Sequence, residues 1–108
     1  MNTDLQEFTL DRKDCLIHYW LAGPADAPLV VFTHGATVDH HEWEATLPLV
    51  SSKYRVLAWD MRAHGLSRPA PFSMQAAVDD LIALLDTLKV DQAVLVGHSL
   101  GGNLGQEV

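Results

Sequence analysis

Residues 96–102 (VGHSLGG) decide the fold, because they place a serine between glycines where an apolar strand meets a helix. Residues 93–96 (AVLV) have the pattern of a buried strand, and the residues after the serine can begin a helix. Gly97 and Gly101 stand two positions either side of Ser99, where any Cβ atom would crowd a tight turn. This G-x-S-x-G spacing predicts a nucleophile elbow, a strained turn that exposes the serine hydroxyl.

Composition limits the remaining possibilities. The chain of 108 residues suffices for one small domain, and a hydrophobic content of 48% is typical of a soluble globular protein with a core. A formal net charge of −7 without any Lys/Arg cluster argues against nucleic acid and membrane surfaces as partners. Charged side chains interrupt the first 30 residues, so we expect neither a signal peptide nor a membrane span. The single cysteine, Cys15, excludes an internal disulfide and favours a cytoplasmic location.

The strands are predicted from four extended runs before the elbow. Residues 5–10 and 16–21 are separated by a polar turn, which predicts a β-hairpin. Residues 29–33 (LVVFT) and 54–59 (YRVLAW) are continuous apolar runs, typical of parallel strands buried on both faces.

Two helices are predicted between these strands. Asp39 is the expected N-cap of the first, Glu42 is its capping-box partner, and apolar residues continue at helical spacing to Val50. Ser73 is the expected N-cap of the second, whose apolar residues fall on one face. The alternation predicts an α/β fold, in which a hairpin is followed by mostly parallel strands with helices on both faces.

The loop after residues 29–33 is the second part of the predicted site. An acyl-transfer site needs two donors for its oxyanion, and we assign them to the backbone N–H groups of Ala36 and Leu100. Gly35 lets the backbone turn sharply after the strand, and the His34 ring is expected to brace the loop.

The other polar and aromatic candidates are interpreted as structural. Adjacent helical residues point about 100° apart, so His40 and His41 are not expected to bind one metal ion. Asp60 and His64 share a loop whose residues predict a turn held by an ion pair. Trp43 is expected to serve in packing of the helix. Because it lies close to Gly35 along the chain, it could also form part of the wall of the substrate cleft.

Together these motifs resemble the N-terminal half of an α/β-hydrolase fold enzyme. They are His34-Gly35, Trp43, the D-x-R-x-x-G-x-S run at 60–67, and GHSLGG at 97–102. The branch includes small esterases, lactonases, carbon–carbon bond hydrolases, cofactor-free haloperoxidases, epoxide hydrolases and haloalkane dehalogenases. Epoxide hydrolases and haloalkane dehalogenases carry an aspartate as nucleophile. Ser99 at that position separates this chain from both groups. The resemblance implies that Ser99 is the nucleophile, that Leu100 and Ala36 form the oxyanion hole, and that Gly97, His98, Gly101, His34 and Gly35 support them.

The resemblance also implies that the chain is incomplete at its C-terminus. In this family an acid and then a histidine follow the serine along the chain, and residues 100–108 contain no aspartate or histidine. We therefore expect residues 1–108 to form a partial domain with negligible turnover by itself. The strand at 93–96 would present an open edge, through which the chain self-associates or binds a complementing chain.

Two hypotheses on function stay open. The first is that the chain is the nucleophile-bearing portion of a serine hydrolase. The hydrolase would act on a small-molecule acyl substrate, such as an ester or lactone, and would use no cofactor or metal. Within the enzyme class, a perhydrolase or a carbon–carbon bond hydrolase would use the same serine. The second hypothesis is a non-catalytic module that pairs through its open sheet edge.

Overall fold

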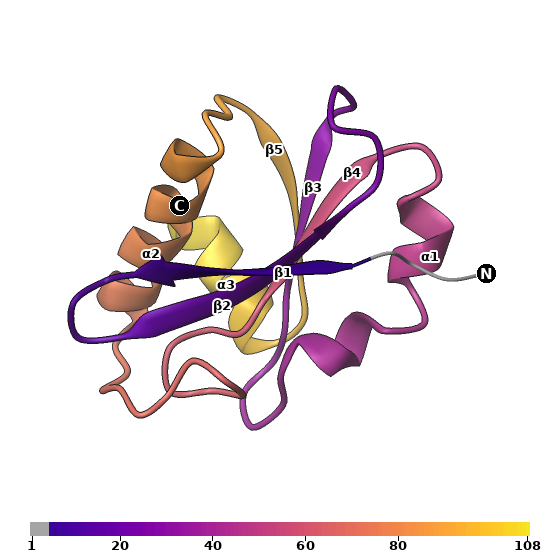
Figure 1. Ribbon diagram of the computed structural model, residues 1–108. Coiled ribbons are helices and arrows are strands. Elements are labelled where there is room, and N and C mark those ends of the chain that lie inside the picture. The colour runs from indigo at the N-terminus through magenta and orange to yellow at the C-terminus, as the bar shows by residue number, and fades with distance from the viewer. Residues whose placement is uncertain (1–4) are drawn as a thin grey trace.

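Five strands form one mixed sheet in the computed structural model, which describes residues 5–108 (Figure 1). The strands lie in the order β1-β2-β4-β3-β5, and β4, β3 and β5 are mutually parallel. β1 and β2 form the predicted antiparallel hairpin, and β2 continues antiparallel to β4. The predicted α/β fold is confirmed. The strands are β1 (Gln6–Asp11), β2 (Leu16–Ala22), β3 (Leu29–Thr33), β4 (Arg55–Trp59) and β5 (Ala93–Gly97).

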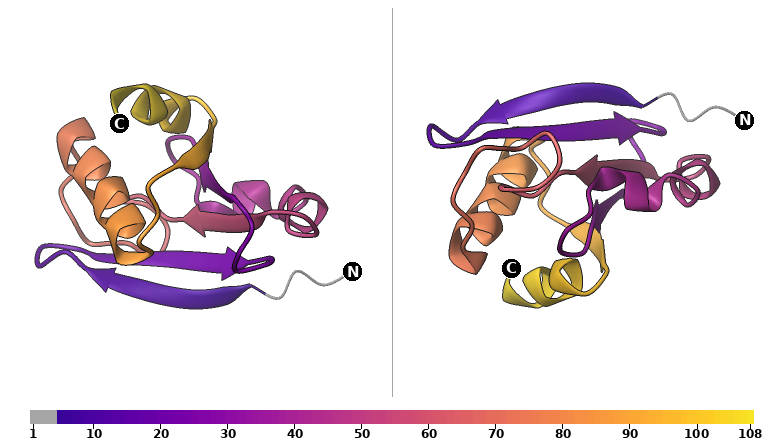
Figure 2. Two further views of the ribbon diagram at one scale, coloured as in Figure 1. Left: turned by 90° about the horizontal axis from the view of Figure 1, so that it is seen from above. Right: turned by 90° about the horizontal axis from the view of Figure 1, so that it is seen from below.

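Different helices cover the two faces of the sheet (Figure 2). Helices α2 (Met74–Thr87) and α3 (Leu100–Glu107) pack on one face, and η1 (His40–Trp43) with α1 (Leu47–Val50) on the other. Side chains of β3 alternate between the two cores, with Val31 on the α2 side and Phe32 on the η1 side. The prediction of burial on both faces is confirmed for β3 and β4. It is wrong for β5, which lies at the edge of the sheet and leaves Val94 exposed. No helix in residues 5–108 is long and apolar enough to cross a membrane.

The helix expected over residues 39–50 is interrupted, so that prediction was wrong in part. Asp39 does cap the first turn, because its Oδ1 accepts the N–H of His41 at 2.9 Å. The turn is a 3₁₀ helix, however, and a separate α-helical turn begins four residues after it ends. Pro48 explains the break, because it has no N–H to donate and its ring would collide with the Glu44 carbonyl in a continuous helix.

Helix α2 begins as predicted. The Ser73 hydroxyl accepts the N–H of Ala76 at 3.1 Å, which satisfies one of the free donors of the first turn.

Distant charges hold the loop after β4. The Arg62 guanidinium donates to Asp80 at 2.7 Å and to Asp14 at 2.9 Å, and Arg12 donates to Asp80 at 3.0 Å. The hydrogen bonds that Arg62 donates to the Asp80 and Asp14 carboxylates raise the pKa of Arg62. The expected ion pair within the loop itself was wrong, because Asp60 bonds to other groups.

Asp80 is fully buried, so its loss should be costly. Asp80→Asn keeps the side-chain volume but leaves the buried Arg62 charge poorly compensated, which we expect to cost about 3 kcal/mol of unfolding free energy. The exposed neighbour supplies a matched control, since Asp79→Asn should stay within about 0.5 kcal/mol of the parent. Denaturant unfolding measures the unfolding free energy of both variants. Equal losses in Asp80→Asn and Asp79→Asn would contradict this account of the network.

Candidate active site

The order of the strands brings two loops together at one end of the sheet. β4 pairs with one side of β3 and β5 with the other, so the chain changes direction across the sheet at β3. Thr33 and Gly97 are register partners at the ends of β3 and β5, and the His98 N–H donates to the Thr33 carbonyl at 3.2 Å. Ligands of open α/β sheets bind at the carboxyl ends of strands at such a switch point.

Ser99 has the strained geometry that the elbow spacing predicts. Its φ of 56° and ψ of −114° lie in a region that residues with a Cβ atom rarely adopt. The residue is exposed, and its hydroxyl makes no hydrogen bond to any group in residues 5–108. The turn therefore holds the serine side chain out from the end of β5.

The glycines beside Ser99 are required by close backbone approach. A Cβ atom at Gly101 would collide with the Thr33 carbonyl oxygen and lie 2.6 Å from that of His34. A Cβ atom at Gly97 would collide with the backbone of Gly101. The predicted crowding at both positions is confirmed, because α3 starts directly against the backbone of β3 and its loop.

Two backbone donors lie near this turn. Leu100 is the first residue of α3, and Ala36 lies in the exposed loop after β3. Within residues 5–108 neither N–H donates a hydrogen bond to another protein group. The N-terminus of α3 adds a partial positive charge on the same side as Leu100. The role of these two N–H groups as donors to an oxyanion stays a prediction.

His34 braces the loop after β3, as predicted. Its ring is fully buried, Nδ1 donates to the Gly35 carbonyl at 2.7 Å, and Nε2 accepts the N–H of Met61 at 3.0 Å. Burial lowers the pKa of the His34 imidazole, which favours the neutral ring that this bonding pattern needs. Both ring nitrogens are occupied, so His34 serves structure.

Asp60 and His64 also belong to the loop structure. The buried Asp60 carboxylate accepts the N–H and Nδ1–H of His40 at 2.7 and 2.9 Å, and the N–H of Leu66 at 2.9 Å. His64 Nδ1 donates to the Arg62 carbonyl at 3.0 Å. The structural interpretation of both residues therefore agrees with their hydrogen bonds.

One geometric expectation about the histidine pair was wrong. The ligand atoms of Asp39, His40 and His41 lie within 4.8 Å of one another, and the two ring centroids are 4.0 Å apart. Each Nδ1 atom is already bonded to a carboxylate, that of Asp60 for His40 and that of Asp39 for His41. These hydrogen bonds account for the cluster, and we assign no ion to it.

Glu42 is the residue that the sequence reasoning misplaced. It does not complete a capping box with Asp39; its Oε1 instead accepts the Gly35 N–H at 2.9 Å. Its Oε2 lies 2.6 Å from Nδ1 of His98, the residue before the serine. Nothing in the local pattern indicates the contact with His98, because it depends on β3 and β5 being neighbours.

Trp43 packs in the core beneath η1. Its indole lies 5.2 Å from the Phe32 ring between centroids, and its buried Nε1 has no hydrogen-bond partner in residues 5–108. Packing of this helical residue was expected, while its role in a cleft wall stays a prediction.

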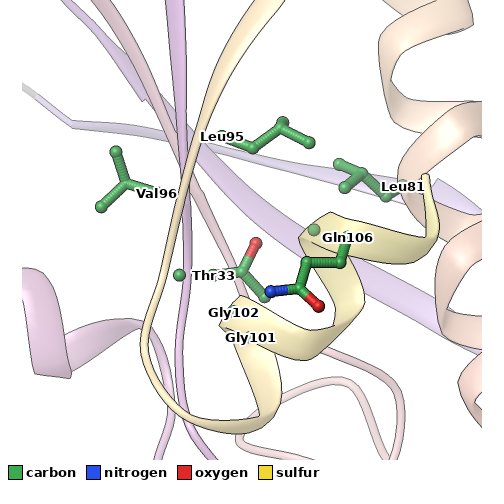
Figure 3. Close-up of a pocket in the computed structure, with 9 residues that line it drawn as sticks. Thr33, Leu81, Leu95, Val96, Gly101, Gly102 and Gln106 are labelled. Atoms are coloured by element: carbon green, nitrogen blue, oxygen red, sulfur yellow. The ribbon is translucent and has the colours of Figure 1, made fainter.

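A cavity of about 240 Å³ lies between β5, α2 and α3 (Figure 3). Leu95, Leu81 and Gln106 line it from these three elements, together with the glycines of α3. Neither Ser99 nor Ala36 lines the cavity. It borders the elbow at Gly97 and Gly101.

Comparison with known proteins agrees with this geometry. A family model described as the alpha/beta hydrolase family matches residues 30–108. The chain belongs to the α/β-hydrolase family. It is 34% identical over 100 residues to 3-oxoadipate enol-lactonase 2 of Acinetobacter baylyi, covering 91% of this chain and 38% of that protein. It is 38% identical over 97 residues to a bifunctional esterase/perhydrolase of Acinetobacter calcoaceticus, covering 87% of this chain and 34% of the relative.

A solved structure gives the same result for this α/β-hydrolase chain. The crystal structure of a hydrolase from Pseudomonas aeruginosa superposes with a TM-score of 0.87 at 35% identity. The match covers 94% of this chain and 40% of that one. The chain therefore spans well under half the length of the proteins it matches.

Two glycines of α3 provide a test of the close approach. Gly101→Ala should lower the unfolding free energy of the intact protein by about 1–3 kcal/mol, because the new methyl group meets backbone atoms. Gly102→Ala is the control: the nearest atom would be 3.5 Å away, and alanine should stabilise the helix by about 0.5–1 kcal/mol. Denaturant unfolding gives both values. Tolerance of alanine at position 101 would contradict the predicted packing.

Proposed function

We propose that Ser99 is the nucleophile of a serine hydrolase that acts on small esters, lactones or related acyl compounds. The observation that carries the proposal is the exposed Ser99 hydroxyl on a positive-φ turn, beside two backbone N–H groups without protein partners. Members of the family to which the chain belongs include an enol-lactonase and an esterase/perhydrolase, which supports an acyl substrate.

The reaction would proceed through an acyl-enzyme. Ser99 Oγ attacks the carbonyl carbon, and the carbonyl oxygen becomes an oxyanion that accepts hydrogen bonds from the N–H groups of Ala36 and Leu100. Expulsion of the alcohol leaves the acyl group on Ser99, and water then releases the acid. Each preorganised donor of this kind is worth about 10²–10³ in kcat.

The serine needs a base to take its proton. No imidazole in residues 5–108 is hydrogen-bonded to the Ser99 hydroxyl, and His34 and His64 are committed to loop contacts. Our proposal therefore includes a triad acid and base supplied by residues other than those of this sequence, and negligible turnover by these 108 residues alone.

A second candidate function within the enzyme class is perhydrolysis, in which hydrogen peroxide replaces water as acceptor of the acyl group. The esterase/perhydrolase relative favours it. Carbon–carbon bond hydrolysis by the same serine is a further alternative. All three reactions would share Ser99 and the two N–H donors.

The nucleophile is tested by substitution in the intact protein. Ser99→Ala should abolish labelling by a fluorophosphonate probe and lower kcat/KM for p-nitrophenyl acetate by about 10⁴-fold or more, because the attacking oxygen is gone. Ser52→Ala, at an exposed serine away from the elbow, should match the parent protein. Intact mass reads the labelling. Persistent labelling of the Ser99→Ala variant would refute the assignment.

The alternative class is a non-catalytic module that pairs through its sheet edge. Among residues 5–108, strand β5 has a neighbour on one side only, and Val94 is 57% exposed. Such an edge favours self-association or addition of a strand from a complementing chain. Neither a nucleic acid nor a membrane is proposed as partner, and the single buried Cys15 supports our proposal of a cytoplasmic location.

Experiments on the isolated chain of 108 residues test two expectations, the effect of the open sheet edge and the lack of a catalytic base. We expect it to oligomerise or to be only marginally folded in sedimentation velocity and thermal unfolding, and to resist fluorophosphonate labelling. A monodisperse monomer that unfolds cooperatively would contradict the importance of the open edge. Labelling of Ser99 in this chain would mean that it contains its own base.

A further inference from the structure

One carboxylate joins the two segments that would form the oxyanion hole. Glu42 Oε1 accepts the N–H of Gly35, in the loop after β3, at 2.9 Å. Glu42 Oε2 lies 2.6 Å from Nδ1 of His98, the residue before Ser99. Glu42 itself lies on η1, so a third element bridges the loop and the elbow. The side chain of Glu42 is 22% exposed and that of His98 is 64% exposed.

The bond to Gly35 has a consequence for Ala36. The Gly35 N–H is fixed by Glu42, and the Gly35 carbonyl is fixed by Nδ1 of His34 at 2.7 Å. Both peptide groups that flank the Gly35 Cα are therefore held. In a planar trans peptide the N–H of Ala36 points opposite to the Gly35 carbonyl, so its direction is set as well.

The ionic contact with His98 bears on the elbow. Gly35 leaves room for the His98 ring, since a Cβ atom at Gly35 would lie 3.0 Å from His98 Nδ1. The His98 N–H donates to the Thr33 carbonyl at 3.2 Å, and its carbonyl accepts the N–H of Gly101 at 3.0 Å. Contact with the Glu42 carboxylate therefore ties the start of α3, and Leu100 with it, to the loop that carries Ala36.

We propose that Glu42 is a positioning residue of the oxyanion hole, which sets the separation and direction of the Ala36 and Leu100 N–H groups. This inference rests on the proposed function of Ser99. Glu42 need not touch the substrate. It acts through Gly35 and His98, so that both donors face one oxygen before the reaction begins.

A purely structural role accounts less well for these contacts. Exposed ion pairs contribute little to stability, and the His98 side chain is mostly in solvent. Glu42 also stands at the capping-box position, yet its carboxylate contacts the two loops instead. The carboxylate therefore orients two segments where little stability is gained.

The test uses the intact protein with p-nitrophenyl acetate as probe. Glu42→Ala should lower kcat about 10- to 100-fold with KM changed less than about threefold, since the loss falls mainly on the transition state. Glu42→Gln should retain more activity than Glu42→Ala, because an amide oxygen still accepts the Gly35 N–H. The matched control is Glu44→Ala, at an exposed acid two residues along, which should behave as the parent protein.

A double-mutant cycle with His98→Ala tests the route of the effect. If Glu42 acts partly through His98, Glu42→Ala should reduce kcat less in the His98→Ala background than in the parent. Fluorophosphonate titration of active sites corrects each kcat for misfolded protein. The melting temperature of Glu42→Ala should stay close to that of Glu44→Ala.

The outcomes separate this inference from the function on which it rests. If the parent neither hydrolyses the ester nor reacts with the fluorophosphonate, or if Ser99→Ala remains active, the proposed function fails and this inference fails with it. If Ser99→Ala is inactive while Glu42→Ala equals Glu44→Ala, only the role of Glu42 fails. If the fluorophosphonate titration shows that Glu42→Ala loses activity only because it has fewer active sites, the role of Glu42 is merely structural.

Discussion

The close approach of helix α3 to strand β3 is the constraint on which the rest of the arrangement depends. Gly101 brings the first turn of α3 against the carbonyl groups that end β3, and no side chain fits between them. The chain must turn sharply to reach this position, which places Ser99 at a positive φ. The same approach brings the elbow beside the loop that carries Gly35 and Ala36. A packing requirement and a candidate catalytic geometry thus share one cause.

Buried polar contacts then fix the loops around this turn. The His34 ring hydrogen-bonds to the Gly35 carbonyl and to the Met61 N–H. The Asp60 carboxylate accepts hydrogen bonds from η1 and from the loop after β4. Burial of these groups makes an unsatisfied partner expensive, so each loop has one favoured conformation. Glu42 on η1 adds a contact with His98, the residue before Ser99. These hydrogen bonds hold the loop that carries Gly35 and Ala36 in place.

Sequence reasoning succeeded where a residue's role depends on its immediate neighbours. The glycine spacing around Ser99, the Ser73 cap and the two-faced burial of β3 follow from local chemistry, and the structure has all three. It failed where the partner is distant. Arg62 pairs with residues 18 and 48 positions away. Glu42 fits a capping-box pattern in the sequence, but its contact with His98 requires β3 and β5 to be neighbours. Pro48 marks the break in the predicted helix over residues 39–50, but the apolar spacing on both sides of it is that of one continuous helix.

The central claim is that Ser99 and two backbone donors form one acyl-transfer site. The most direct measurement is a crystal structure of the intact protein after reaction with a fluorophosphonate, because the phosphonyl oxygen mimics the oxyanion. The account predicts a covalent bond to Ser99 Oγ, with that oxygen about 2.7–3.1 Å from the N–H nitrogens of both Ala36 and Leu100. An adduct on another residue, or a phosphonyl oxygen directed into solvent, would contradict it.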